Sequence, residues 1–191
     1  MARDVKQELL TRGVAMLLQH GYHDLGVAAL LDATNTPKGS FYHYFKSKED
    51  FGLQVIDLYM KEVHAGLDQC LGDTRLSPLK RVRRFFEISE EKYRTEGYLG
   101  CLLGGLGQEL SGVSEVFRRK VEQCFSQIGA RIAACLKQAV AEGELPKGTD
   151  TRRLAKLLVN CWEGAALRSR LLKDSAPLRE MLDFYFHAVA A

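Results

Sequence analysis

The stretch from Thr36 to Lys48 constrains the chain more than any other, because it combines helix signals with aromatic and basic side chains. Pro37 fixes φ and suits the first turn of a helix, so a short helix is predicted to begin there. Phe41 and Phe45 are four residues apart and share one side of that helix, which we expect to face inward. The other positions carry small, hydroxyl, imidazole or ammonium groups: Lys38, Gly39, Ser40, Tyr42, His43 and Tyr44. Such groups allow close approach and donate to phosphate oxygens, so this face suits a nucleic-acid groove, although many aromatic-rich amphipathic helices are simply core helices.

A second short helix pattern precedes this stretch. Val27, Leu30 and Leu31 share one side of the segment 27–34. Asn35 follows where a tight turn requires a positive φ, which Asn tolerates better than most residues. A helix, a tight turn and a helix with a polar face form the helix-turn-helix arrangement, which favours DNA binding over a core helix.

From Val5 to about Phe51 the chain resembles the TetR family of bacterial transcriptional repressors, most specifically over residues 37–49. Gly26, Asn35 and Thr36 stand where that family often has Thr, Gly and Val, and the first of these departures removes one phosphate contact. The resemblance implies that a recognition helix faces the major groove and that a lysine anchors a phosphate. The residues concerned are Lys38, Gly39, Ser40, Tyr42, His43, Tyr44 and Lys48.

The placement of charge agrees with a DNA-binding role better than the total does. The net charge of the 191 residues is only +3. Residues 1–50 hold six cations and six acids, and three of the cations lie around the predicted recognition helix, namely Lys38, Lys46 and Lys48. The sequence therefore indicates a local basic site and not a broadly cationic surface.

Five cysteines without a C-x-x-C pair argue against a disulfide framework or a zinc site, and free thiols indicate a reducing compartment. The Met-Ala-Arg-Asp start is expected to begin a polar helix and lacks the apolar segment of a signal peptide. No apolar run approaches the roughly 20 residues that span a bilayer. We therefore expect a cytoplasmic protein without a metal or other cofactor.

Helical periodicity runs along the whole chain and no strand pattern is persuasive, so we expect an all-α fold of about nine helices. A DNA-binding domain is predicted over 1–47, and an effector-binding and dimerisation domain over 48–191. Besides the helix 27–34 and the helix from Pro37, the expected helices are 4–20, 48–70, 78–96, 114–142, 150–172 and 176–190. Ser47, Ser77 and Ser114 are the predicted N-caps of three of them, and Asp150 is predicted to start another.

Two segments of the C-terminal part are unusual. Six glycines stand among apolar residues between Gly97 and Gly112, although each interior glycine costs a helix about 1 kcal/mol. Close packing, a ligand or a mobile segment would explain them. A basic cluster on the helix 78–96 is predicted to be mostly a solvated face, and it consists of Lys80, Arg81, Arg83 and Arg84.

The last two helices have more apolar residues than one buried side requires. A helix that is apolar on several sides needs several neighbours, and Gly164, Ala165 and Ala166 would allow close approach. We therefore expect a homodimer through these two helices. In the TetR family such a pair of helices forms a four-helix interface, which would set two recognition helices on a palindromic operator.

Cys101 is the candidate sensor. Tyr98-Leu99-Gly100-Cys101-Leu102-Leu103, with Glu109, Leu110 and Ser111, resembles the TetR regulators of N-ethylmaleimide reductase and acrylate-utilisation genes, which respond to electrophiles or unsaturated acids. A cysteine at a helix start can have its thiolate stabilised by the helix dipole. Free cysteines are usually small buried hydrophobes, and we expect that of Cys70, Cys124, Cys135 and Cys161. Tyr93, Trp162 and Arg170 are predicted to converge with Cys101 in the effector site.

These features predict a homodimeric repressor, not an enzyme, that a small-molecule inducer releases from its operator. The alternatives are a reversible inducer with a structural Cys101, a helical enzyme, and an architectural DNA binder without effector control. No catalytic constellation supports the enzyme. Sequence-indifferent binding with a steep salt dependence would mark the architectural protein.

Overall fold

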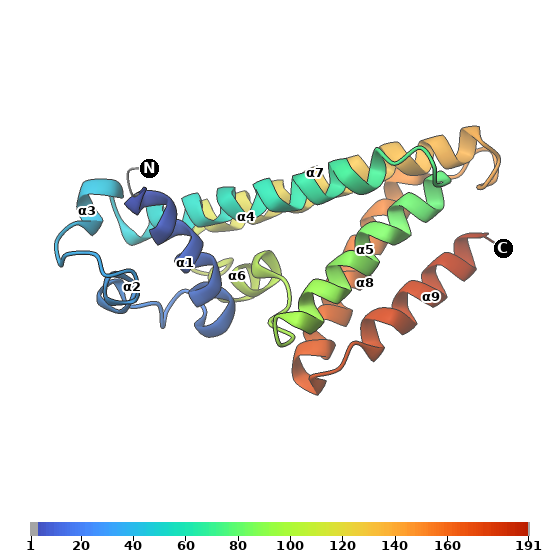
Figure 1. Ribbon diagram of the computed structural model, residues 1–191. Helices are drawn as coiled ribbons and strands as arrows, with labels where there is room; N and C mark the ends of the chain where they lie inside the picture. The colour runs from blue at the N-terminus through green and yellow to red at the C-terminus, as the bar shows by residue number, and fades with distance from the viewer. Residues whose placement is uncertain (1–3, 191) are drawn as a thin grey trace. The chain divides into compact units, whose positions relative to one another are not determined.

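A computed structural model describes residues 4–190 of the chain. Residues 1–3 and 191, which include the predicted Met-Ala-Arg start and the outer ends of both predicted domains, lie outside the described residues. All regular elements within 4–190 are helices (Figure 1), so the all-α prediction is confirmed. The helices are α1 Val5–His20, α2 Val27–Ala33, α3 Phe41–Tyr44, α4 Lys48–Leu71, α5 Pro78–Thr95, α6 Leu102–Leu110, α7 Glu115–Ala141, α8 Thr151–Leu172 and α9 Ala176–Ala190.

The described residues form two compact units, each made of two stretches of chain. The first unit comprises residues up to 62 together with 102–121, and the second comprises 63–101 together with residues from 122 onward. Helices α4 and α7 each contribute residues to both units. The division predicted after residue 47 stays a prediction.

Side-chain caps begin several helices where the sequence places them. The Asp4 carboxylate accepts from the Gln7 N–H and the Asp150 carboxylate from the Arg153 N–H, each at 3.0 Å. The Ser47 hydroxyl accepts from the Asp50 N–H at 3.0 Å, and the Ser114 hydroxyl from the Phe117 N–H at 3.3 Å. Each bond satisfies a backbone donor that the first turn of a helix leaves unpaired, so the N-cap predictions for Ser47 and Ser114 are confirmed. The caps at Asp4 and Asp150 lie at the predicted starts of their helices.

Ser77 is the N-cap residue of α5 and Pro78 opens the helix, as predicted, but the Ser77 side chain does not do the capping. Its hydroxyl makes no cap hydrogen bond and is buried without a hydrogen-bond partner. The Leu79 N–H in the first turn donates instead to the Glu144 carboxylate at 2.9 Å. Glu144 is 65 residues further along the chain, so a long-range contact replaces the local cap.

The glycine-rich stretch contains a helix, α6. Four leucines of α6 are buried: Leu102, Leu103, Leu106 and Leu110. A Cβ added at Gly107 would make an ordinary contact of 3.4 Å with the Val121 Cγ1 atom, so α6 lies close to the first turns of α7. Burial of the leucine side chains, each worth about 2 kcal/mol, offsets the low helix propensity of the glycines.

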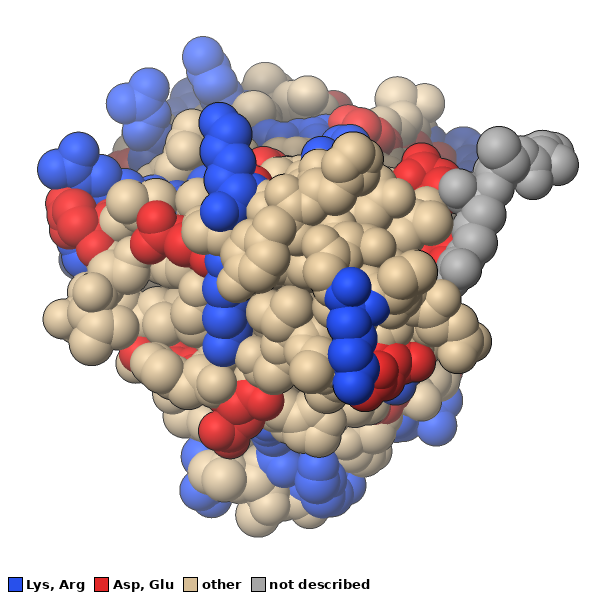
Figure 2. Space-filling view, turned by 90° about the vertical axis from the view of Figure 1, so that its left-hand side faces the viewer, with Lys and Arg blue, Asp and Glu red and all other residues tan. Residues whose placement is uncertain are grey.

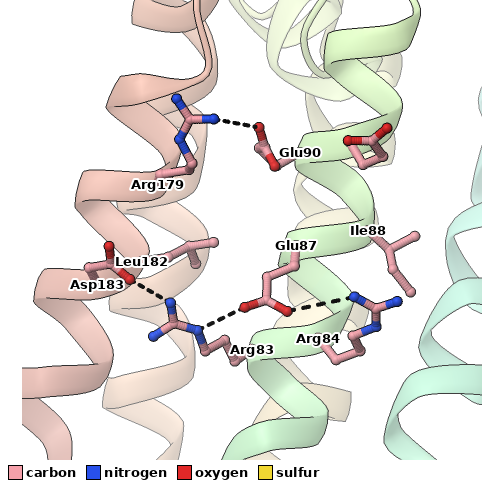
Figure 3. Close-up of a pocket in the computed structure, with 9 residues that line it drawn as sticks. Arg83, Arg84, Glu87, Ile88, Glu90, Arg179, Leu182 and Asp183 are labelled. Atoms are coloured by element: carbon pink, nitrogen blue, oxygen red, sulfur yellow. Dashed lines mark hydrogen bonds and ion pairs between the residues drawn. The ribbon is translucent and has the colours of Figure 1, made fainter.

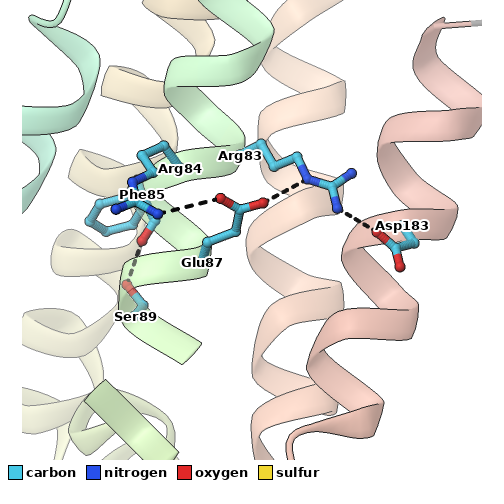
Figure 4. A network of polar contacts seen from close by, with 6 residues as sticks. All are labelled: Arg83, Arg84, Phe85, Glu87, Ser89 and Asp183. Atoms are coloured by element: carbon cyan, nitrogen blue, oxygen red, sulfur yellow. Dashed lines mark hydrogen bonds and ion pairs between the residues drawn. The ribbon is translucent and has the colours of Figure 1, made fainter. Parts of the chain in front are cut away.

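Arginines of the predicted basic cluster are tied into the second unit. Arg83 donates to Glu87 at 2.9 Å and to Asp183 of α9 at 2.5 Å, and Glu87 also pairs with Arg84 at 3.8 Å (Figure 4). Arg81 is buried and donates to the Leu76 carbonyl at 2.7 Å and to the Gln138 side chain at 3.0 Å. The prediction of a solvated face is therefore wrong for Arg81, which is buried, whereas Arg83 is paired but keeps 38% of its side chain exposed.

Candidate functional site

The helix-turn-helix segment comprises α2, a turn and the very short helix α3. Asn35 has a φ of 48°, which confirms the predicted positive value. The prediction that a helix begins at Pro37 is wrong. The Ser40 N–H donates to the Pro37 carbonyl at 3.0 Å in a turn, and Gly39 has a φ of 100° that no right-handed helix contains. The helix therefore starts only at Phe41.

Three phenylalanines hold α3 in place. Phe41 and Phe45 are each only 1% exposed, which confirms that they face inward. Their ring centroids are 5.1 Å apart, and the Phe51 ring of α4 lies 5.5 Å from Phe41 and 5.0 Å from Phe45. Tilted and edge-to-face aromatic contacts at such distances add directional stabilisation to the burial. The orientation of a four-residue helix is thus fixed by packing.

The outward residues of this segment leave a mainly uncharged face. Tyr42 is 69% exposed, and Lys38, Gly39 and His43 are exposed as well. Ser40, Tyr44 and Lys48 are half-buried. Figure 2 shows the side on which α2 and α3 lie in Figure 1, where uncharged side chains fill much of the middle and basic and acidic side chains lie among and around them. The assignment of these seven residues to DNA contacts stays a prediction.

Lys48 has intramolecular partners. Its ammonium donates to the His23 carbonyl at 3.3 Å and lies 4.7 Å from the centroid of the Tyr22 ring. Both partners belong to the connection between α1 and α2, so Lys48 helps to hold that connection against the start of α4. The half-buried position leaves part of the side chain open to solvent.

Glu109 of α6 holds the same connection, a contact that the sequence did not indicate although Glu109 belongs to the segment that carries the subgroup resemblance. Its carboxylate accepts from the Tyr22 N–H at 2.7 Å, from the His23 N–H at 2.6 Å, and lies 2.6 Å from His23 Nδ1. Burial opposes ionisation of Glu109, but these backbone and ring hydrogen bonds outweigh it and lower its pKa. The partners are 86 and 87 residues apart in sequence, and no local signal indicates the pairing.

Two of the predicted effector residues lie together in the second unit. The Tyr93 and Trp162 rings are 5.7 Å apart, and the Phe86 ring lies 4.8 Å from Trp162. All three side chains are buried. They form an aromatic cluster between α5 and α8.

A strained turn leads to Cys101. Gly97, Tyr98 and Gly100 all have positive φ, at 78°, 60° and 81°. Arg170, the third predicted effector residue, donates to the Leu99 carbonyl at 3.1 Å, and Lys173 donates to the Gly97 carbonyl at 3.3 Å. The C-terminal end of α8 thus holds the turn, and the chain then reaches Cys101, one residue before α6.

Cys101 is hydrogen-bonded to Glu163, the residue that follows Trp162 on α8. Burial raises the pKa of Glu163 to about 7, an effect that the hydrogen bond from Cys101 only partly opposes. Glu163 was also missed from the sequence, where the only signal is an acid in the apolar stretch Cys161-Trp162-Glu163-Gly164. The half-buried Cys101 thiol therefore lies beside a carboxyl group that titrates near neutrality, and such a carboxylate can accept a proton from the thiol.

The other cysteines have different surroundings. Cys70, Cys124 and Cys135 are buried, and burial raises the pKa of Cys70 and of Cys135. Cys135 donates to the Pro78 carbonyl at 3.4 Å. Cys161 is half-buried, as Cys101 is, and so provides a natural comparison for thiol reactivity.

Two hollows lie in the second unit. One, of about 540 Å³, lies between α5 and α9, and its charged groups pair with one another, as Arg179 does with Glu90 and Arg83 with Asp183 (Figure 3). The other, of about 1020 Å³, lies between α7 and α8 and has Glu163 in its wall.

Across residues 4–190 no cluster of three His, Cys, Asp or Glu side chains is arranged to hold a metal ion. Nor does any helix of the described part combine the length and apolar character needed to cross a membrane.

Two family models match the chain. Residues 9–55 match the model of bacterial regulatory proteins of the tetR family. Residues 78–185 match the model of the tetracyclin repressor-like C-terminal domain. The first match contains the helix-turn-helix segment, and the second contains α5, Cys101, Trp162 and Arg170.

Named proteins resemble the chain over nearly its full length. Transcriptional regulator AcuR of Cereibacter sphaeroides is 39% identical over 173 residues, which cover 90% of this chain and 79% of AcuR. The transcriptional repressor NemR of Escherichia coli is 30% identical over 185 residues, 94% of this chain and 90% of NemR. Its solved reduced form superposes with a TM-score of 0.87 at 27% identity, covering 96% of this chain and 95% of that one. The crystal structure of a regulatory protein TetR from Rhodobacter sphaeroides superposes with a TM-score of 0.90 at 37% identity. The match covers 95% of this chain and 96% of that one.

Proposed function

Because this chain belongs to the TetR family of DNA-binding helix-turn-helix transcriptional regulators, we propose that it is a homodimeric repressor of a palindromic operator, released by an inducer sensed at Cys101. The family and the relatives are regulators and not enzymes, which sets the enzymatic alternative aside. The NemR relationship also supports the predicted subgroup. A repressor of this kind acts in the cytoplasm, where the DNA is.

The outward face around α3 supports the DNA-reading part of the proposal. Gly39 has open space around the position of its missing Cβ, so a sugar-phosphate backbone can come close. Tyr42 and His43 present donors beside Lys38, while the buried phenylalanines keep the helix rigid. Phosphate contacts would position the segment, and side chains reaching base edges would select the sequence.

Exposed apolar residues on α8 and α9 support the homodimer. Leu157, Leu167 and Leu171 recur on one face of α8 together with the exposed Gly164, and all three leucines are at least 42% exposed. Phe184 on α9 is 77% exposed. Helix α9 packs against α8. A continuous apolar face on two neighbouring helices suits burial against an identical copy.

The contact between Cys101 and Glu163 is the single observation that carries the sensing part. The Glu163 carboxylate can take the thiol proton, and the resulting thiolate can attack an electrophilic alkene carbon. The new S–C bond forms as the C=C π bond breaks, and the proton held by Glu163 passes to the adjacent carbon. No other reactant is needed, and the reaction leaves a bulky thioether between the 97–100 turn and α8.

The rival within this family is a reversible inducer with a structural Cys101. The hollow between α7 and α8 favours it, because a cavity of about 1020 Å³ is large enough for a small molecule. The two readings differ in whether the thiol is required for release from DNA.

The test compares binding to the DNA upstream of the gene before and after treatment with N-ethylmaleimide. Wild type is expected to lose operator binding, and Cys101→Ser is expected to keep it. Cys161→Ser is the matched control, since Cys161 is also half-buried, and it should respond as wild type does. Unchanged binding by the treated wild type, with Cys101 alkylated according to mass spectrometry, would make Cys101 structural.

A further inference from the structure

The groove between α7 and α8 separates its charged groups along its length. The two helices diverge from the connection 142–150 that joins them (Figure 1). Lys137, Arg152 and Lys156 line the groove at the end nearest that connection. Glu122 and Glu163 line the opposite end. Since Glu122 and Lys137 are fifteen residues apart on α7, the two ends are about 22 Å apart along that helix.

The three cations make no ion pair with a carboxylate of the described residues. Among the described residues no acid lies within ion-pairing distance of Lys137, Arg152 or Lys156, whereas the arginines of the α5–α9 hollow are paired (Figure 3). The first turn of α8 adds the positive end of a helix dipole, part of which the Asp150 cap offsets. The cations at this end of the groove are therefore able to pair with a bound anion.

The middle of the groove is mostly apolar and lined by small residues, with Ser126 and Asn160 as uncharged polar neighbours. Gly129, Ala130, Ala133 and Ala134 of α7 face Val159 of α8, and Phe125 lies further along. A Cβ added at Gly129 would meet no atom within 4 Å, so the space beside this helix is open. From Phe125 to Ala133 this floor extends about 12 Å. An apolar chain, and not a second charged group, suits this part of the groove.

We propose that this groove binds an elongated organic anion, whose carboxylate or phosphate pairs with Lys137, Arg152 and Lys156 while its apolar chain lies along the floor of α7. The far end of such a ligand reaches Glu163, whose carboxyl group is hydrogen-bonded to Cys101. The ligand therefore contacts the residue that controls the thiol. This assignment concerns a reversible ligand of the groove and rests on the proposed repressor function only for its effect on DNA binding.

Binding is measured directly by isothermal titration calorimetry of the full chain with decanoate and with decyl phosphate. Saturable binding of either anion, with no binding of decyltrimethylammonium or acetate, is the expected result. The Lys137→Gln/Lys156→Gln variant should bind about tenfold more weakly, because two partly exposed ion pairs are lost. The Lys61→Gln/Lys80→Gln variant is the matched control, because both lysines are exposed and lie outside the groove, and its affinity should equal that of wild type.

Gly129→Leu provides the second test, because the added side chain enters open space and should leave the fold intact. Decanoate binding should be abolished while the circular dichroism spectrum stays that of wild type. Equal binding by wild type, Gly129→Leu and the double lysine variant would overturn the assignment. A change of oligomeric state in Gly129→Leu would overturn it too, because the groove would then be a contact between subunits. Operator binding, measured separately in the absence of any anion, reports on the proposed repressor function alone.

Discussion

Glu163 and Glu109 are both carboxyl groups with apolar residues nearby, yet their surroundings move their pKa values in opposite directions. At Glu163 burial dominates and raises the pKa to about 7, with one weak thiol donor as partner. At Glu109 two backbone N–H groups and an imidazole outweigh burial and lower the pKa. The number and strength of the donors around each carboxyl group decides which charge state the folded chain favours.

Glu163→Gln is expected to change how stability depends on pH. The pKa of Glu163 is raised from 4.5 in the unfolded chain to about 7 in the folded one, so folding favours its protonated form. That contribution is complete below about pH 4.5 and is lost as the pH rises to about 7. The free energy of unfolding of wild type should therefore fall by about 1–3 kcal/mol relative to the variant over this interval. Urea denaturation at a series of pH values measures it, and parallel profiles for the two proteins would refute the burial of an ionisable Glu163.

At the scale of elements, local signals predict where most helices begin and long-range contacts account for the errors. Ser47 and Ser114 cap their helices as predicted, because an N-cap needs only a residue three positions away. Ser77 occupies the predicted N-cap position, but Glu144 supplies the acceptor in place of its side chain. The start of α3 was misplaced because Pro37 is as compatible with a turn as with a helix, and the φ of Gly39 decides between them.

Local spacing also indicates part of the candidate site, whereas the rest of the site depends on long-range contacts that the sequence does not indicate. The inward phenylalanines and the outward face of α3 follow from spacing within one helix. The contacts of Glu163 with Cys101 and of Glu109 with Tyr22 depend on how distant segments pack. The α7–α8 groove depends on the angle at which two helices diverge, which no single helix encodes.

Alanine substitutions at two helical glycines, Gly13 and Gly105, should have opposite effects on the stability of the fold. A Cβ at Gly13 of α1 would collide with the buried Phe51 ring and lie 2.9 Å from Val55 Cγ2, whereas a Cβ at Gly105 of α6 would meet nothing. Overpacking costs about 1–3 kcal/mol and exceeds the gain in helix propensity of about 1 kcal/mol, so Gly13→Ala should destabilise the fold. Gly105→Ala should stabilise it by up to about 1 kcal/mol. Thermal denaturation of both variants checks the contrast, and a rise in Tm for Gly13→Ala would contradict the close packing of α1 on α4.

At the scale of the whole molecule, the proposed function needs two copies of the chain, because a palindrome has two half-sites and each copy supplies one reading face. Occupation of both half-sites at once makes operator affinity depend on the link between the copies. The exposed apolar face of α8 and α9 is the proposed link.

Leu171→Asp and Phe184→Asp are each expected to convert the dimer to a monomer, since a charge buried at an interface without a partner is strongly unfavourable. Sedimentation velocity should show half the mass, and operator affinity should fall at least tenfold. Val113→Asp is the control, because Val113 is 73% exposed and lies outside α8 and α9. Dimers in both interface variants, with tight operator binding, would place the interface elsewhere.

The ribosome makes Glu109 long after the backbone of Tyr22 and His23, to which Glu109 is hydrogen-bonded. The helices α1 to α3 emerge early, but the carboxylate that holds the backbone of Tyr22 and His23 is made more than eighty residues later. The first compact unit is thus complete only after residue 121 has been translated. The helices α8 and α9, which carry Glu163 and the proposed dimer face, are made later still. A nascent chain therefore completes its DNA-reading face before it can pair with a second copy, so operator binding through both half-sites has to wait for the full chain.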